Sequence, residues 1–184
     1  RRRSAQTAMY EILKELIVLL TPILSFTMEE VYQFMQKPAD APESVMLLEW
    51  PAMHEEYLDK EKLAKWDAFI SLRGEITKVL EMRRREKKIG NSLDARVDIY
   101  AEGEALALLK SMEKELATLL IVSQAVLHEG LTEEGEATER KDLKVAVTPA
   151  EGHKCERCWT YDVTVGQDPA HPTLCRRCIE VLTK

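Results

Sequence analysis

The sequence predicts a mainly α-helical chain with a small α+β subdomain and a short cysteine-rich ribbon at its end. Three observations support this fold class. Apolar residues recur at helical spacing through most of residues 1–92, as in amphipathic helices. The pattern of residues 93–150 then changes to the alternation of short strands around one helix. All four cysteines of the 184-residue chain follow, within residues 151–184.

Residues 1–92 are expected to form a partial helical bundle that ends in one long helix. Residues 7–20 carry an apolar stripe, and Pro22 then ends or bends that helix. A capping box at residues 27–30 predicts a second helix, followed by a proline-rich connection over residues 37–54. The second helix is expected to bury Val31, Tyr32, Phe34 and Met35. Because the first helix needs more apolar partners than follow it, we expect the chain to be a piece of a longer protein.

The long helix is predicted over residues 58–88, with Gly90 and Asn91 as its stop signal. Its last turns are strongly basic, and the cations there are Arg83, Arg84, Arg85, Lys87 and Lys88. Although the whole chain has a net charge of −6, residues 73–96 contain eight Lys and Arg against four Asp and Glu. This basic run predicts either a nucleic-acid contact or a solvated helix end that suits the helix dipole.

Residues 93–150 are predicted to form a small α+β domain. Residues 95–100, 121–127 and 143–148 have the composition of strands, and residues 104–120 that of a helix. A strand, a helix and two further strands suggest a small mixed sheet with one covering helix. An acidic turn over residues 129–142, with six acids against two bases, separates the last two strands.

Residues 151–184 carry the strongest motif of the chain. Cys155, Cys158, Cys175 and Cys178 form two C-x-x-C pairs that are sixteen residues apart. This is the spacing of a four-thiolate zinc ribbon, in which each pair aims two sulfurs at one metal. Four protein ligands leave no open position, so we expect one structural zinc ion. Two disulfides, or His153 or His171 in place of one sulfur, are the alternatives.

The sequence shows no catalytic residues. It contains no G-x-S-x-G turn, no phosphate-binding Walker loop and no H-E-x-x-H helix. Its longest apolar run, residues 16–20, is too short to span a membrane. A binding module is therefore expected rather than an isolated enzyme or a membrane protein.

Nucleic acid is the ligand class that the cysteine segment favours. Arg157 lies inside the first C-x-x-C pair, Arg176 and Arg177 lie inside the second, and Trp159 follows the first. Arginine forks match phosphate geometry, and aromatic rings stack on unpaired bases. The alternative for Trp159 is a ring packed over the metal site as a miniature core.

The motifs at residues 154–159 and 174–178 resemble the C-terminal zinc finger of bacterial isoleucyl-tRNA synthetases. Residues 2–8, 21–30, 88–95 and 121–124 are similar to successive parts of the same region of that family, in the same order. The resemblance therefore covers nearly the whole chain.

The resemblance implies a tRNA-binding region, which recognises the anticodon arm of tRNA(Ile) for a cytoplasmic class I aminoacyl-tRNA synthetase. The parent isoleucine–tRNA ligase would use ATP to attach isoleucine to tRNA, and it would be monomeric with no membrane association. Neither ATP-binding signature of the family occurs in this chain, so the chain alone is expected to be non-catalytic. The basic helix end and the finger's Arg157, Trp159, Arg176 and Arg177 would face the RNA.

Two other functions are compatible with the sequence. The finger could be a purely structural clamp that holds the C-terminus on the small sheet and touches no RNA. The chain could also be a free-standing zinc-ribbon adaptor that binds protein.

Overall fold

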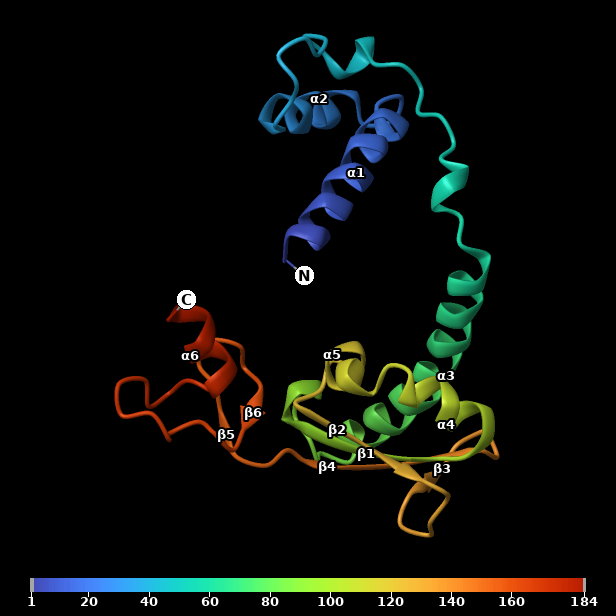
Figure 1. Cartoon of the computed structure of the whole chain (residues 1–184), viewed down its shortest axis with the longest axis vertical. Helices are drawn as coiled ribbons and strands as arrows, with labels where there is room; N and C mark the ends of the chain where they lie inside the picture. The colour runs from blue at the N-terminus through green and yellow to red at the C-terminus, as the bar shows by residue number, and fades with distance from the viewer. Residues whose placement is uncertain (1, 184) are drawn as a thin grey trace. The chain divides into compact units, whose positions relative to one another are not determined.

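The computed structural model describes residues 2–183, which divide into two units, residues 2–58 and 59–183. Figure 1 shows helices in the first unit, and helices, a sheet and a smaller segment with β5, β6 and α6 in the second. The predicted fold class is confirmed. The boundary between the units lies inside the first of the three predicted domains, and the division at residues 92 and 150 stays a prediction.

The first unit is built from α1 (Arg2–Leu20) and α2 (Ser25–Phe34), with 3-10 turns at Val45–Leu47 and Glu55–Tyr57. Its core consists of four buried residues, Ile17, Met28, Tyr32 and Val45. The carboxylate of Glu29 accepts hydrogen bonds from the Ser44 hydroxyl at 2.6 Å and from the Val45 N–H at 3.0 Å. These bonds fix the long connection against α2.

Three predictions for the first unit are wrong. Phe34 is 86% exposed, because Met28 and Tyr32 already fill the interface between α2 and α1. The capping box is also absent, because α2 begins at Ser25 and residues 27–30 lie inside the helix, whose N-cap Leu24 makes no side-chain cap. α1 begins at Arg2 rather than at residue 7.

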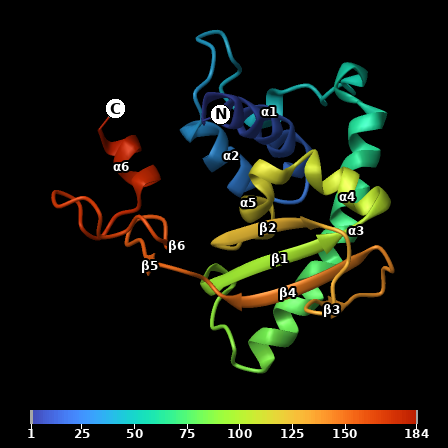
Figure 2. The ribbon, with the colours of Figure 1, turned by 60° about the horizontal axis from the view of Figure 1, so that its bottom comes forward.

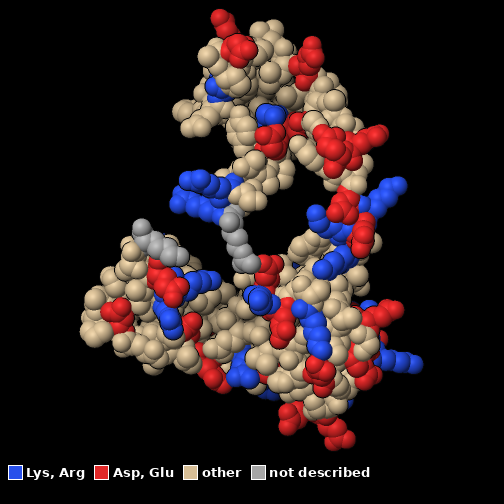
Figure 3. All heavy atoms as spheres, viewed as in Figure 1, with Lys and Arg blue, Asp and Glu red and all other residues tan. Residues whose placement is uncertain are grey.

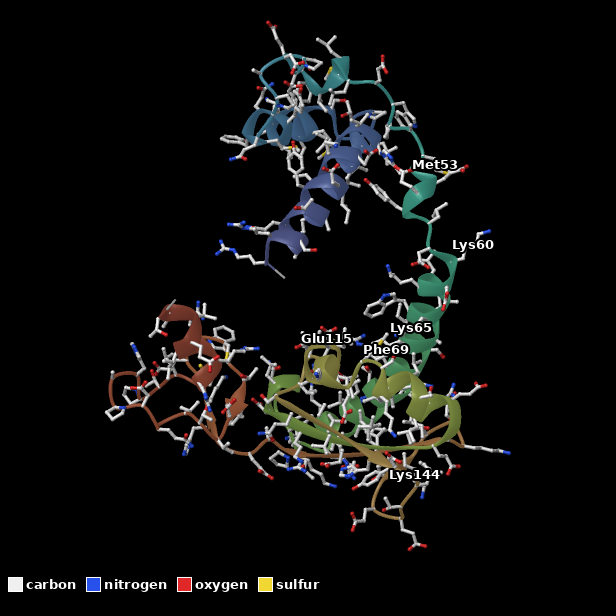
Figure 4. All side chains as sticks on the ribbon, viewed as in Figure 1. Met53, Lys60, Lys65, Phe69, Glu115 and Lys144 are labelled. Carbon is white, nitrogen blue, oxygen red and sulfur yellow. The ribbon has the colours of Figure 1, made fainter. Side chains whose placement is uncertain are left out.

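The second unit begins with α3 (Lys60–Arg85), which the Asp59 carboxylate caps by accepting a hydrogen bond from the Lys62 N–H at 2.9 Å. The helix ends three residues before its predicted end. Lys87, with φ of 59°, adopts the left-handed conformation that usually stops a helix, so the stop precedes Gly90. Phe69, labelled in Figure 4, lies on the buried side of α3.

A four-stranded mixed sheet in the order β2-β1-β4-β3 forms the centre of this unit. Its strands are β1 (Ala95–Ala101), β2 (Gln124–Glu129), β3 (Glu136–Ala137) and β4 (Leu143–Pro149). β1 pairs in parallel with β2 and antiparallel with β4, so that Val97 lies opposite Ala125 and Val147. Figures 1 and 2 show the helices gathered on one face of the sheet, where the alternate residues of β1 are buried.

The predicted helix over residues 104–120 is interrupted. It consists of α4 (Gly103–Lys110), a 3-10 turn (Glu113–Glu115) and α5 (Leu116–Leu120). The non-helical backbone of Met112 breaks it and lets Leu109 and Leu116 both enter the core. β2 starts at Gln124 rather than at residue 121, because Ile121 is left-handed with φ of 58°. β3, inside the acidic turn, was not predicted.

The end of the second unit is a small module, residues 152–182, which we call the cysteine module. It contains the short strands β5 (His153–Lys154) and β6 (Tyr161–Asp162) and the helix α6 (Arg176–Leu182). Its buried residues are Cys155, Val165, Cys175 and Cys178, which form a core of their own.

Candidate metal centre and nucleic-acid interface

The fold brings the two C-x-x-C pairs together. Cys155 and Cys158 lie in the turn between β5 and β6, and Cys175 and Cys178 lie at the start of α6. The four Sγ atoms lie within 4.8 Å of one another, and none of the four cysteines is in a disulfide. Since the two pairs are far apart in sequence but converge on one point, the four sulfurs form a ligand cage for one metal ion and not two disulfide bonds.

Hydrogen bonds to the sulfurs favour thiolates in part of this cage. Burial acts to raise the pKa of Cys158, but hydrogen bonds from the hydroxyl and backbone N–H of Thr160 outweigh it and lower that pKa to about 6. The Cys175 N–H donates to Cys155 Sγ at 3.3 Å. Burial raises the pKa of Cys175 to about 12, and the neighbouring sulfurs add to that rise. Four thiolates this close together require a cation between them at neutral pH.

This donor set fits zinc. Soft thiolate ligands in a closed four-sulfur group select zinc or iron–sulfur centres over hard cations such as magnesium. Among residues 2–183, the cysteines are the one group of three or more metal-ligating side chains that converge, and neither His153 nor His171 belongs to it. A zinc ion here would close the module and leave no position for substrate.

Two of the three arginines in the module contact the sulfurs. A hydrogen bond to Cys158 raises the pKa of the Arg177 guanidinium, and burial raises the pKa of Cys178 while a hydrogen bond from Arg157 opposes that rise. Zinc with four thiolates carries a net charge of about −2, which two guanidinium groups would balance. Sequence reasoning assigned both arginines to RNA and missed this contact.

Trp159 lies outside the core of the module. Its side chain is 61% exposed, and its backbone has a φ of 65°, in the left-handed region that aromatic residues rarely adopt. The indole N–H donates to the Glu156 carbonyl at 3.1 Å, and the Lys154 ammonium lies 5.7 Å from the ring centroid. The ring is therefore held outward beside a cation instead of covering the metal site.

Arg176 lies on the surface of the module. Its side chain is 80% exposed and pairs with Glu180, at 3.2 Å, in the next turn of α6. An exposed ion pair of this kind contributes about 0–1 kcal/mol to stability. An incoming phosphate can therefore displace the Glu180 carboxylate at little cost.

The basic end of α3 is largely neutralised. Arg83 is only 18% exposed and donates to Glu86 at 3.0 Å and to Glu136 at 2.5 Å. Arg84 pairs with Glu81 at 2.8 Å, and Lys88 pairs with Glu86 at 2.9 Å. On the face of the second unit that Figure 3 draws, basic and acidic side chains are likewise interspersed.

Two cations of this run are better placed to meet a ligand. Arg85 and Lys87 are exposed, and among residues 2–183 no carboxylate lies within ion-pair distance of either. The five cations of this run therefore differ in their availability to bind an anionic ligand.

Comparison with known proteins gives two family matches in chain order. Residues 1–99 match the model described as "Anticodon-binding domain of tRNA ligase", which covers more than half of the chain. The chain belongs to this family. Residues 152–181 match the model "Zinc finger found in FPG and IleRS", and this match together with the four converging cysteines suggests zinc binding. The family resemblance inferred from the sequence is confirmed.

Curated relatives extend the match over nearly the whole chain. An isoleucine–tRNA ligase from Desulforamulus reducens is 46% identical over 183 residues, and one from Moorella thermoacetica is 46% identical over 185 residues. Each alignment covers 98% of this chain and 20% of the relative. An isoleucine–tRNA ligase from Geobacter sulfurreducens is 41% identical over 96% of the chain and 19% of its own length.

This member of the anticodon-binding family thus spans about one fifth of the length of the curated ligases that it matches. None of the helices within residues 2–183 has both the length and the hydropathy that a membrane crossing needs.

Proposed function

We propose that this chain is the tRNA-binding C-terminal region of an isoleucine–tRNA ligase. It would recognise the anticodon arm of tRNA(Ile), so that the parent enzyme attaches isoleucine to that tRNA using ATP. The observation that carries the proposal is the collinear match of one chain to an anticodon-binding domain and to a zinc finger. The partners are the tRNA and the remainder of the synthetase chain, in a monomeric cytoplasmic enzyme.

The cysteine module contributes a fixed, outward-facing set of contacts. One structural zinc ion, held by Cys155, Cys158, Cys175 and Cys178, would keep the two C-x-x-C turns together. Trp159 would stack on an unpaired base, a contact worth roughly 1–3 kcal/mol. Arg176 would bind a backbone phosphate of the RNA. Arg157 and Arg177 would interact both with the cysteine sulfurs and with the RNA.

The basic end of α3 would add phosphate contacts through two residues in particular. Arg85 and Lys87 are the two that we expect to bind phosphate. The other three cations, Arg83, Arg84 and Lys88, would first have to break their ion pairs to reach RNA. No residue of this chain is proposed to act in catalysis.

The contacts of Arg157 and Arg177 with sulfur favour a second candidate function, in which the module is only a structural clamp. The two candidates differ in what Trp159 does. As a clamp, the module would tolerate loss of the exposed ring, whereas RNA recognition would not.

A gel-shift titration with tRNA(Ile) and a non-cognate tRNA tests the proposal. We expect tighter binding of tRNA(Ile), an affinity that falls steeply with salt, and about a tenfold loss for Trp159→Ala. Val163→Ala is the matched control, because Val163 is 58% exposed in the same module and no RNA contact is proposed for it. Equal affinity for both tRNAs would refute the proposal, and an unchanged affinity for Trp159→Ala with retained zinc would favour the clamp.

A further inference from the structure

The hydroxyl of Ser123 joins three separate segments of the second unit. Ser123 lies between α5 and β2, and its Oγ donates to the Leu93 carbonyl just before β1. The same Oγ accepts a hydrogen bond at 2.7 Å from the N–H of Tyr161, on β6 of the cysteine module. A hydroxyl has one hydrogen to donate. Ser123 uses it on the sheet side and accepts a bond from the module side.

The next residue, Gln124, holds the chain that enters the cysteine module. Its side-chain amide donates to the Glu151 carbonyl at 3.0 Å and accepts from the Glu151 N–H at 3.0 Å. The Glu151 carboxylate in turn accepts from Arg96 of β1 at 2.7 Å. Because the Gln124 side chain bonds both backbone polar groups of Glu151, residue 151 is held beside β2 much as a paired strand residue would be.

The residues on either side of Glu151 are equally constrained. The Ala150 N–H donates to the Asp94 carbonyl at 2.7 Å. Gly152 has a φ of 91°, and a Cβ built on it would lie 2.4 Å from the carbonyl carbon of Asp162 in β6. Residues 150–152 therefore form a joint whose first two residues are bonded to the sheet side and whose third residue packs closely on β6.

This polar joint sets the orientation of the module because apolar packing does not. The core of the module is separate from the core around the sheet. Between the two lies a cavity of about 290 Å³, whose lining includes Ile121, Ser123, Tyr161 and Arg177. Without a shared apolar core, a few hydrogen bonds must determine the direction in which the module points.

We infer that Ser123 is a positioning residue that fixes the orientation in which the cysteine module presents Trp159. Tyr161, which it binds, is two residues from Trp159, and the β5–β6 turn between them is held by the Cys155 N–H donating to the Thr160 carbonyl at 2.9 Å. The inference rests on the proposed function for its consequence in tRNA binding.

The test compares Ser123→Ala with Ser123→Thr, which keeps the hydroxyl, and with Ser111→Ala. Ser111 is a matched control because its hydroxyl bonds only to the Leu108 carbonyl within its own helix end. In the whole chain, we would measure bound zinc, amide hydrogen exchange at Tyr161 and affinity for tRNA(Ile). For Ser123→Ala we expect unchanged zinc content, exchange at Tyr161 about tenfold faster, and a several-fold weaker affinity for tRNA(Ile).

Ser123→Thr is expected to restore both the exchange rate and the affinity, and Ser111→Ala to leave both unchanged. Unaltered exchange at Tyr161 in Ser123→Ala would refute the inference that the Ser123 hydroxyl holds the module through the Tyr161 N–H. Faster exchange with full tRNA affinity would refute the inference that Ser123 positions the module for tRNA binding. If the native chain binds no tRNA, the proposed function fails, while the exchange measurement still decides whether Ser123 holds the module.

Discussion

Replacing Gly152 by alanine tests, by direct steric means, the close packing of the module end of the joint on β6. An added Cβ would lie 2.4 Å from the carbonyl carbon and 2.5 Å from the carbonyl oxygen of Asp162, so the backbone of β6 must move away. The left-handed backbone alone costs an alanine about 1–2 kcal/mol. Overpacking that shifts the backbone adds about 1–3 kcal/mol. We therefore expect the free energy of unfolding to fall by about 3 kcal/mol in all.

Gly130 supplies a matched control for this substitution. Its φ of 85° is close to the 91° of Gly152, but a Cβ at Gly130 would meet no atom within 4 Å. Gly130→Ala should therefore show only the backbone cost, about 1–2 kcal/mol. Urea unfolding of both variants measures the difference, which isolates the contact between residue 152 and β6. Equal losses in the two variants would refute the close approach on which the joint depends.

Three further predictions concern backbone strain, charge and metal. Ile121→Gly should raise the free energy of unfolding, measured in urea, by about 1 kcal/mol, because glycine adopts the left-handed backbone of this position without strain and the side chain it removes is 56% exposed. A loss of stability would contradict this prediction. Burial acts to raise the pKa of Asp98, but bonds from Arg96 and His128 outweigh it and lower that pKa. A lowered folded pKa contributes stability above the unfolded value and loses it as pH falls through the folded value. Asp98→Asn should therefore cost about 1–2 kcal/mol at pH 7, and in unfolding measured against pH the difference should shrink in acid; a constant difference would contradict the ion pairing. A chelator should expose four reactive thiols per chain while the far-ultraviolet signal of the sheet persists, and thiols that react fully before chelation would exclude a bound metal.

Residue periodicity was sufficient to predict most of the helices and strands themselves, because each depends on a local pattern. The alternating pattern predicted a strand over residues 95–100, and the alternate residues Val97 and Ile99 of β1 are fully buried. Element ends were less predictable, since Lys87 and Ile121 adopt left-handed conformations that sequence patterns assign to glycine or asparagine. Phe34 has helical spacing like its neighbours, and only the packing of α2 on α1 shows that it points away.

The candidate site was predictable where its residues are close in sequence. It was unpredictable where charged residues far apart in sequence come into contact. The C-x-x-C spacing identified a four-cysteine group, and the structure brings those four sulfurs together. The run of cations at the end of α3 gave no sign that Arg83 meets Glu136, which is 53 residues away. Likewise, the role of Ser123 depends on Tyr161, 38 residues later. Such pairs are set by the tertiary fold, which local patterns do not contain.

We propose that this chain recognises the anticodon arm of tRNA(Ile) through a zinc-held module. The most direct test of this proposal is the affinity of the zinc-loaded chain for the tRNA(Ile) anticodon stem-loop, compared with the same stem-loop carrying an altered anticodon. If loop bases stack on Trp159 and phosphates bind the exposed cations, the altered loop should bind about tenfold more weakly. Equal affinity for the two stem-loops, with zinc bound, would contradict the claim.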